Sequence, residues 1–255
     1  MTLQMNPALA AGYTSASQMA RLITEDWGAN NLYCCACQTD TLVSAPNNEP
    51  AYDYFCGSCK ARYQLKSGKK WVKTKITDGA LGKMTEAVEC GNTPNLLYLH
   101  YHAAPGWTVA NLLLVPSFFF TMSMIEARKP LGPDAKRAGW QGCNLRMDYV
   151  APDGKRKLID SDIVTPKAEI RAWYARVQPL KEIPITARGW TLDVLNIVQH
   201  LGTEFNLSDV YAHEATLSEL HPDNRHVKDK IRQQLQVLRD LGFIEFLGRG
   251  RYLRR

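Results

Sequence analysis

The sequence has no apolar run long enough to cross a membrane. Its longest apolar stretch, residues 109–122, is interrupted by Asn111 and Pro116 and falls short of the roughly 20 residues that a spanning helix needs. The first residues, MTLQMNPALAAGY, place no basic region ahead of an apolar core, so no secretory signal is expected. These two absences predict a cytoplasmic protein without membrane contact. The composition, 45% hydrophobic and 22% charged, excludes a largely disordered chain.

Seven cysteines are present, and in a reducing compartment they favour metal ligation over disulfides. Four of them follow the pattern C-x2-C-x18-C-x2-C, which is the ligand spacing of one structural zinc site: Cys34, Cys37, Cys56 and Cys59. Four thiolates leave no open coordination position for catalysis. Cys35 could replace Cys34 only through a tighter chelate, so we expect it to be a free thiol. Cys90 and Cys143 are expected to be small buried side chains.

Positive charge is concentrated at the C-terminus. Residues 225–255 hold nine Lys and Arg against three acids, a surplus equal to the net charge of +6 of the whole chain. A basic terminal segment on a near-neutral body predicts a polyanionic partner, most simply nucleic acid. The alternative is a solvated charged tail.

The hydrophobic pattern predicts a mixed α/β body followed by a small helical module. Helices are expected at 15–30, 78–90 and 166–178, and strands at 52–55, 63–65, 95–102 and 109–116. The stretch 126–145 is rich in Pro, Gly and basic residues, which predicts an exposed functional loop. A linker at 179–187 would separate two domains, 1–182 and 183–255.

The last 70 residues have the pattern of a winged helix. Thr191 is expected to cap a helix that ends near His200, and Asn206 with Asp209 resembles a capping box for a second. A third helix at 224–241 carries an apolar stripe, and the segments FIEF and RYL predict a hairpin with Arg249 at its tip. In such modules the third helix enters the major groove.

Candidate DNA contacts follow from this placement. Arg232, Gln233 and Gln236 are expected to read bases, because Arg favours guanine and Gln favours adenine. The residues expected to contact the DNA backbone or to flank the readers are Arg225, Lys228, Arg239 and Arg249, with Arg137 in the basic loop. Their alternative role is solubility.

Asp53, Gln64 and Lys66 lie next to the second cysteine pair. Metal-dependent cleavage of a phosphodiester needs an acidic ligand for Mg²⁺, a second oxygen ligand and a cation near the attacked phosphate. Because side chains alternate along a strand, Gln64 and Lys66 share one face and Leu65 takes the other. The pattern alone is common, and a surface ion pair would also account for it.

Several segments together resemble the DpnI family of methyl-directed restriction endonucleases. They are LITEDW, YCCAC, DYFCGSCKARYQLKS, TDGA, RKPLGPDAKRAGWQGCN, RGWT and KIRQQLQVLRDLGFIEFLGRGRY. The resemblance implies a nuclease domain of the PD-(D/E)XK fold with an embedded zinc site, followed by a winged helix. It implies Mg²⁺-dependent cleavage of duplex GATC whose adenine is N6-methylated. It also implies that Asp53, position 64 and the backbone carbonyl of Leu65 bind Mg²⁺ and that Lys66 is the catalytic lysine.

Position 64 departs from the family pattern, because an acid is usual there and this chain has Gln64. An amide oxygen still ligates Mg²⁺, but the site loses one negative charge, so we expect a raised Mg²⁺ requirement. Glu25, in the first predicted helix, could supply a replacement carboxylate, although an ordinary surface acid is the simpler interpretation.

Trp140 lies between Gly139 and Gly142 in the basic loop. A methyl group on adenine adds apolar surface to the major-groove edge, which an exposed indole can contact, whereas a core anchor is the alternative role. The leading interpretation is thus a monomeric methyl-directed endonuclease with Mg²⁺ and structural Zn²⁺. A methyl-adenine-dependent DNA-binding protein without catalysis and a zinc-ribbon protein of RNA processing are the alternatives.

Overall fold

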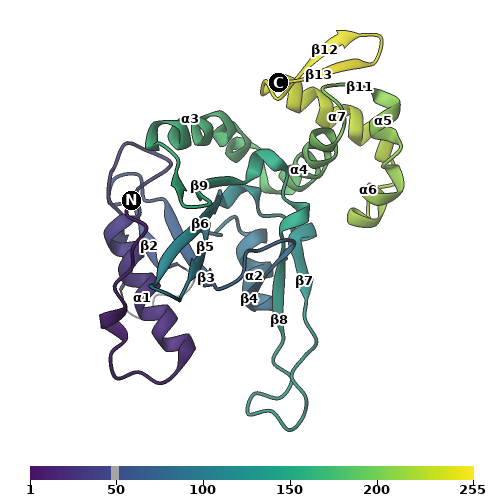
Figure 1. The fold of residues 1–255 in the computed structure, drawn as a ribbon. Helices are drawn as coiled ribbons and strands as arrows, with labels where there is room; N and C mark the ends of the chain where they lie inside the picture. The colour runs from purple at the N-terminus through teal and green to yellow at the C-terminus, as the bar shows by residue number, and fades with distance from the viewer. Residues whose placement is uncertain (47–51) are drawn as a thin grey trace. The chain divides into compact units, whose positions relative to one another are not determined.

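The computed structural model describes residues 1–46 and 52–255. Two compact units share them (Figure 1). Unit 1 comprises residues 1–73, 93–118 and 155–178, and unit 2 comprises 74–92, 119–154 and 179–255. Each unit is therefore built from segments that are distant in sequence. The division at residues 182 and 183 stays a prediction.

Unit 1 contains a seven-stranded sheet in the order β1-β2-β3-β5-β6-β9-β10. The pair β3 and β5 is parallel, and the other neighbours are antiparallel. The strands are β1 (Val43–Ser44), β2 (Tyr54–Phe55), β3 (Arg62–Gly68), β5 (Asn95–His102), β6 (Thr108–Val115), β9 (Arg156–Asp160) and β10 (Ile163–Val164). The two buried strands expected from sequence are β5 and β6.

Helices α1 (Ala16–Asn31) and α3 (Lys167–Val177) belong to the same unit. α1 lies against the sheet, since the Tyr54 hydroxyl donates a 2.7 Å hydrogen bond to the Glu25 carbonyl and the hydroxyls of Thr24 and Ser67 are 3.3 Å apart. Gly28 permits this approach, because a Cβ there would lie 2.4 Å from the Tyr54 hydroxyl oxygen. The first helix is thereby fixed beside β2, which Asp53 directly precedes, and β3, which carries Lys66.

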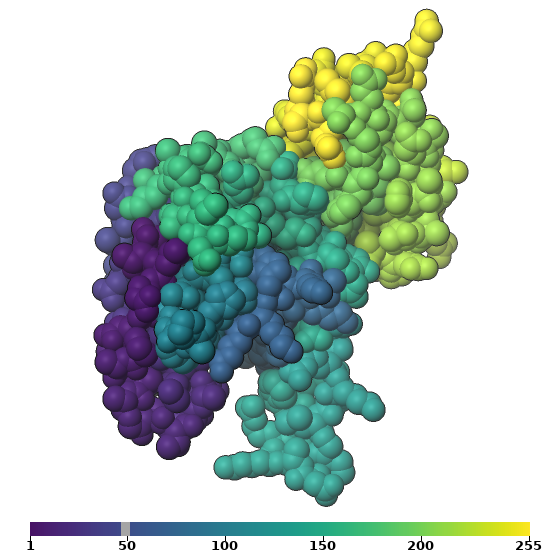
Figure 2. Space-filling view, viewed as in Figure 1, coloured from purple at the N-terminus to yellow at the C-terminus, as the bar shows by residue number. Residues whose placement is uncertain are grey.

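One part of unit 2 is the small sheet β4-β8-β7 with helix α2. The elements are β4 (Lys75–Ala80), α2 (Leu81–Glu89), β7 (Ile125–Ala127) and β8 (Gly142–Arg146). Residues 128–141 connect β7 to β8 and project from them as an arm, drawn in teal in Figures 1 and 2. Short 3-10 turns complete the two units: Pro7–Ala10, Ser117–Phe119, Met122–Met124, Met147–Tyr149, Pro152–Gly154 and Gln178–Glu182.

The C-terminal part of unit 2 has the winged-helix arrangement expected from sequence. Its elements are α4 (Ile185–His200), β11 (Glu204–Asn206), α5 (Leu207–Tyr211), α6 (Glu214–Leu220), α7 (Val227–Asp240), β12 (Ile244–Gly248) and β13 (Arg251–Arg254). β13 pairs with both β11 and β12. The capping box is present, with the Asn206 N–H donating to Asp209 Oδ2 at 2.7 Å. The class expected from sequence, mixed α/β with a C-terminal winged helix, is confirmed.

Two local expectations about this part were wrong. Thr191 does not cap a helix: it is buried within α4, and its hydroxyl donates to Gln234 Oε1 at 2.7 Å. The expected linker at 179–187 is occupied by a 3-10 turn and by the first turn of α4. Pro184 immediately precedes that helix, a position where the missing N–H has little cost. Within the described residues, no helix combines the length and apolarity that crossing a membrane requires.

Candidate active site and zinc site

The four predicted zinc ligands come together in unit 1. The sulfur atoms of Cys34, Cys37, Cys56 and Cys59 all lie within 4.8 Å of one another. The Cys34–Cys59 and Cys37–Cys56 sulfur pairs are 3.5 and 3.6 Å apart. A tetrahedral zinc with Zn–S bonds of 2.3 Å needs sulfur separations of about 3.8 Å. The donor set and its spacing therefore fit a structural Zn²⁺.

Cys35 stays outside this cluster. Its sulfur approaches the Tyr33 carbonyl at 3.8 Å, and burial raises the pKa of its thiol to about 12. Cys35 is thus a buried free thiol outside the metal-binding cluster, as expected. Cys143 is buried as expected, whereas Cys90 is exposed, so the prediction for Cys90 was wrong.

Arg171 on α3 holds the first cysteine loop in place. Its guanidinium donates to the carbonyls of Cys34 and Thr39 at 3.2 and 3.0 Å and to Asp40 at 3.0 Å. It also lies over the Tyr33 ring, 5.4 Å from the centroid. Since Arg171 is more than 130 residues from this loop in the chain, no local sequence signal pointed to the contact.

Tyr63 connects the zinc cluster to β3, the strand of Gln64 and Lys66. Its buried hydroxyl accepts a hydrogen bond from the Cys35 N–H at 3.0 Å and lies 3.4 Å from Cys34 Sγ. Its carbonyl accepts from the Asp53 N–H at 2.9 Å. One residue thus fixes β3 against both the cysteine loop and the backbone of Asp53.

Asp53 is fixed at the other end by its carboxylate. Asp53 Oδ2 accepts a 2.7 Å hydrogen bond from the Leu65 N–H, so the acid lies beside the segment Gln64-Leu65-Lys66. The pKa of Asp53 is raised, mainly because the carboxylate is buried, and the charge of Glu25 raises it further. The Leu65 hydrogen bond and the charges of Lys66 and Arg21 act in the opposite direction. The charge of Glu25, on α1, thus reaches Asp53, and the Glu25 side chain pairs with Arg21 at 2.7 Å.

Gln64 and Lys66 lie on one face of β3, opposite Leu96 and Tyr98 of β5. The Asp53 carboxylate, the Gln64 amide and the Leu65 carbonyl are all oxygen ligands of the kind that Mg²⁺ takes. Over residues 1–46 and 52–255, the four-cysteine group is the only cluster of three or more His, Cys, Asp or Glu suited to a metal. At the Asp53 site, position 64 contributes an amide where a carboxylate is usual in the family that the sequence resembles.

Trp140 lies in the arm between β7 and β8. Its indole packs over Gly142, where an added Cβ would lie 2.9 Å from the ring, and Arg137 stacks on it at 4.9 Å. Hydrogen bonds along the arm, including Leu131 N–H to the Trp140 carbonyl at 2.9 Å, give it a defined backbone. The Trp140 side chain is partly buried. Whether it contacts a methyl group or serves as a core anchor stays a prediction.

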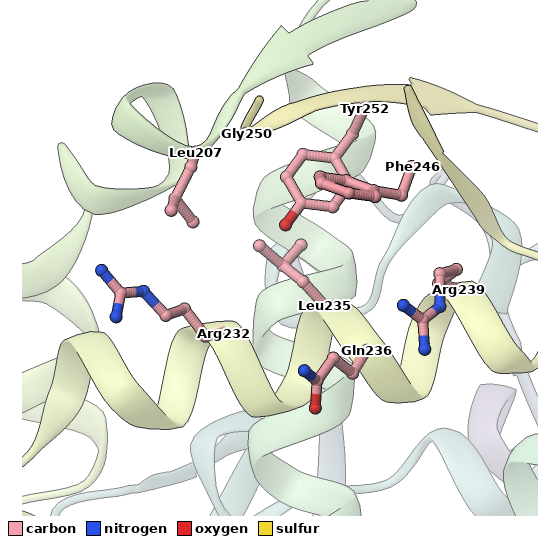
Figure 3. Close-up of a pocket in the computed structure, with 8 residues that line it drawn as sticks. All are labelled: Leu207, Arg232, Leu235, Gln236, Arg239, Phe246, Gly250 and Tyr252. Carbon is pink, nitrogen blue, oxygen red and sulfur yellow. The ribbon is translucent and has the colours of Figure 1, made fainter. Parts of the chain in front are cut away.

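The predicted base readers on α7 are not all placed alike. Arg232, Gln236 and Arg239 line a pocket of about 280 Å³ whose walls include Leu207, Leu235, Phe246 and Tyr252 (Figure 3). Gln233 instead accepts a hydrogen bond from Lys230 at 2.9 Å. Phe246 and Tyr252, on the two strands of the wing, were not predicted as site residues. The sequence did hold a signal for them, because both are aromatic residues in a hairpin rich in arginine.

The remaining predicted DNA contacts lie around α7. Lys228 pairs with Glu214 at 3.3 Å, and both Lys228 and Arg232 lie over the Tyr211 ring. Arg225 precedes α7 on an exposed segment, and Arg249 occupies the wing turn with a left-handed φ of 52°. Their DNA contacts stay predictions.

Comparison with known families covers nearly the whole chain. The profile of the Dam-replacing family matches residues 1–183. That of the Dam-replacing HTH domain matches residues 186–254, the segment that contains α7 and the wing. The chain belongs to the Dam-replacing family and carries that family's helix-turn-helix domain at its C-terminus.

Proposed function

We propose that this protein is a Mg²⁺-dependent endonuclease that cleaves duplex DNA at GATC sites whose adenine is N6-methylated. The observation that carries the proposal is the 2.7 Å hydrogen bond from the Leu65 N–H to Asp53 Oδ2, which sets the acid beside Gln64 and Lys66. The winged helix supports a DNA substrate, and the family match supports methyl-directed recognition. We propose the PD-(D/E)XK fold for the nuclease domain on the same grounds.

The residues divide the work of hydrolysis. When bound, Mg²⁺ would polarise the scissile phosphate and stabilise the charge that develops on it. Asp53, the Gln64 amide oxygen and the Leu65 carbonyl would hold the ion. The Lys66 ammonium, on the same face as Gln64, would orient the attacking water and stabilise the phosphorane-like transition state. The zinc cluster does no chemistry: it keeps β3 in place through Tyr63 and the cysteine loop.

Methyl recognition would use two apolar surfaces. The Trp140 indole offers one in the arm. The pocket beside α7 offers another, because Leu235, Phe246 and Tyr252 supply apolar walls between Arg232 and Arg239 (Figure 3). A methyl group placed in either site gains about 0.8 kcal/mol from burial, while Gln236 could pair with an adenine edge.

One alternative rests on a specific residue. With Gln64, the site has one carboxylate fewer than is usual at this position. If the site therefore failed to cleave, the protein would be a methyl-adenine-dependent DNA-binding protein. The same assay separates the two functions. The purified chain is incubated with Mg²⁺ and plasmid DNA from hosts with and without adenine methylation, with Lys66→Ala as the inactive control.

We expect cleavage of the methylated plasmid alone, and none by Lys66→Ala. Retention of methylated DNA without cleavage at any Mg²⁺ concentration would support the binding protein instead. Equal treatment of both plasmids would contradict both functions.

A further inference from the structure

A row of residues crosses the sheet of unit 1 on the face that carries Lys66. Lys66 on β3 is paired with Tyr98 on β5, Tyr98 with Leu113 on β6, and Leu113 with Lys157 on β9. Directly opposed residues share a face of the sheet. Three strand spacings of about 4.8 Å place the two lysine backbones about 14 Å apart, which corresponds to several nucleotides at a rise of about 3.4 Å per strand.

The segment Lys69-Lys70-Trp71, which follows β3, is fixed on this face. The Tyr98 hydroxyl donates to the Lys70 carbonyl at 2.9 Å. The Trp71 ring lies 6.2 Å from the Tyr98 ring and 6.1 Å from the His100 ring. At the end of β3, Gly68 lets the Tyr98 hydroxyl approach the backbone closely, since a Cβ there would lie 2.4 Å from the hydroxyl oxygen. The segment is therefore a built structure.

His100 acts as an anchor in this arrangement. The Ser161 N–H donates to Asn111 Oδ1 at 3.1 Å, so the Asn111 amide nitrogen faces His100 Nδ1, also at 3.1 Å, and donates to it. Burial and the neighbouring His102 lower the pKa of His100, so the ring is neutral at pH 7. The positive charge of this face comes from its lysines.

Three lysines belong to this part of the face: Lys69 and Lys70 precede Trp71, and Lys157 lies over its ring. Lys69 and Lys70 are exposed, and neither forms an ion pair with any residue in 1–46 or 52–255. Lys157 Nζ lies 5.0 Å from the Trp71 ring centroid and pairs with Asp160 at 2.6 Å. Two acids lie close to these groups: Asp160, which pairs with Lys157, and Asp162, whose charge acts on His100. An exposed pair such as Lys157–Asp160 is weak enough to exchange for a phosphate.

We propose that Lys69 and Lys70, which precede Trp71, and Lys157, which lies over its ring, form a phosphate-binding ledge that holds the duplex backbone next to the scissile phosphate. The ledge lies on the face of Lys66, so DNA bound there would align its strand along the row from Lys66 to Lys157. Its cations complement the polyanionic backbone and carry no base preference. This inference rests on the proposed endonuclease function.

The test compares Lys69→Ala/Lys70→Ala and Lys157→Ala with Lys83→Ala/Lys181→Ala, which removes two exposed lysines outside the ledge. Binding of a methylated GATC duplex is measured without Mg²⁺ as a function of salt, and cleavage is measured with Mg²⁺. Each lost phosphate contact lowers the slope of log K against log salt by about 0.9. We expect a decrease of about two for the ledge double variant and about one for Lys157→Ala.

Affinity and kcat/KM of the ledge double variant should fall roughly tenfold or more at physiological salt, with unchanged preference for methylated DNA and an unchanged melting temperature. The control should behave as the wild type. A wild-type salt slope and kcat/KM in both ledge variants would overturn the ledge while leaving the endonuclease intact. A wild-type chain that does not cleave methylated DNA would overturn the endonuclease and, with it, the ledge.

Discussion

Under the proposed function, Gln64 is the residue on which catalysis should depend most. It lies on the same face of β3 as Lys66, and the neighbouring Asp53 is already hydrogen-bonded to the Leu65 N–H. Under the proposed function it is the second ligand of the metal. An amide in this position contributes a dipole where a carboxylate would contribute a full charge. The charge of Glu25, on α1, raises the pKa of Asp53, and under the proposed function it would add to the negative field at the metal site.

Replacing Gln64 with Glu should lower the Mg²⁺ concentration for half-maximal cleavage by roughly tenfold, because Mg²⁺ affinity rises with the number of ligand charges. The measurement is a Mg²⁺ titration of single-turnover cleavage. Gln178→Glu, at an exposed position after α3, adds the same charge elsewhere and should leave the midpoint unchanged. An unchanged midpoint in Gln64→Glu would show that position 64 does not ligate the ion.

Trp140 should contribute to methyl discrimination. Trp140→Ala removes the indole from the arm, so the ratio of affinities for methylated and unmethylated duplex should fall roughly fourfold or more, the value of one buried methyl group. Trp140→Phe keeps an aromatic surface and should retain most of that ratio. Full discrimination by Trp140→Ala in an equilibrium binding assay would assign methyl recognition to the α7 pocket alone.

At the scale of elements, the zinc cluster is held by α3 as well as by its own loops. Arg171 donates to two loop carbonyls and to Asp40, contacts that a lysine cannot reproduce together. Arg171→Lys should lower the free energy of unfolding by about 2 kcal/mol and speed the loss of zinc to EDTA. The cleavage rate should then fall as zinc is lost. Arg176→Lys, exposed on the same helix, is the matched control. Equal rates of zinc loss to EDTA from the two variants would show that Arg171 does not hold the cysteine loop in place.

Elements with a strong local pattern were predicted well, and contacts between distant segments were not. The alternation of Tyr63, Gln64, Leu65 and Lys66 and the spacing of the cysteines are local properties, so β3 and the sulfur cluster follow from them. The start of α4 was misjudged because Gly189 weakens its helical pattern and Thr191 resembles a cap. The partner that buries Thr191 is Gln234, 43 residues away.

At the scale of the whole molecule, the sequence predicted the class and the C-terminal winged helix, because the last 70 residues carry its helical and hairpin patterns and residues 225–255 carry the surplus of positive charge. It did not predict that each compact unit combines segments that are distant in sequence. For example, β4, α2 and the arm belong to the same unit as residues 179–255. The contacts of Tyr63, the contacts of Arg171 and the ledge beside Trp71 were missed for the same reason. Each joins side chains that only the folded chain brings together.

The most direct test of the account is the single-turnover cleavage rate of a short duplex containing one GATC site, with and without N6-methyladenine, at saturating Mg²⁺. We predict cleavage of the methylated duplex, at least tenfold slower cleavage of the unmethylated one, and none of either by Lys66→Ala, with the zinc content of that variant unchanged. Equal rates on the two duplexes, or wild-type cleavage by Lys66→Ala, would contradict the assignment of a methyl-directed nuclease centered on Asp53, Gln64 and Lys66.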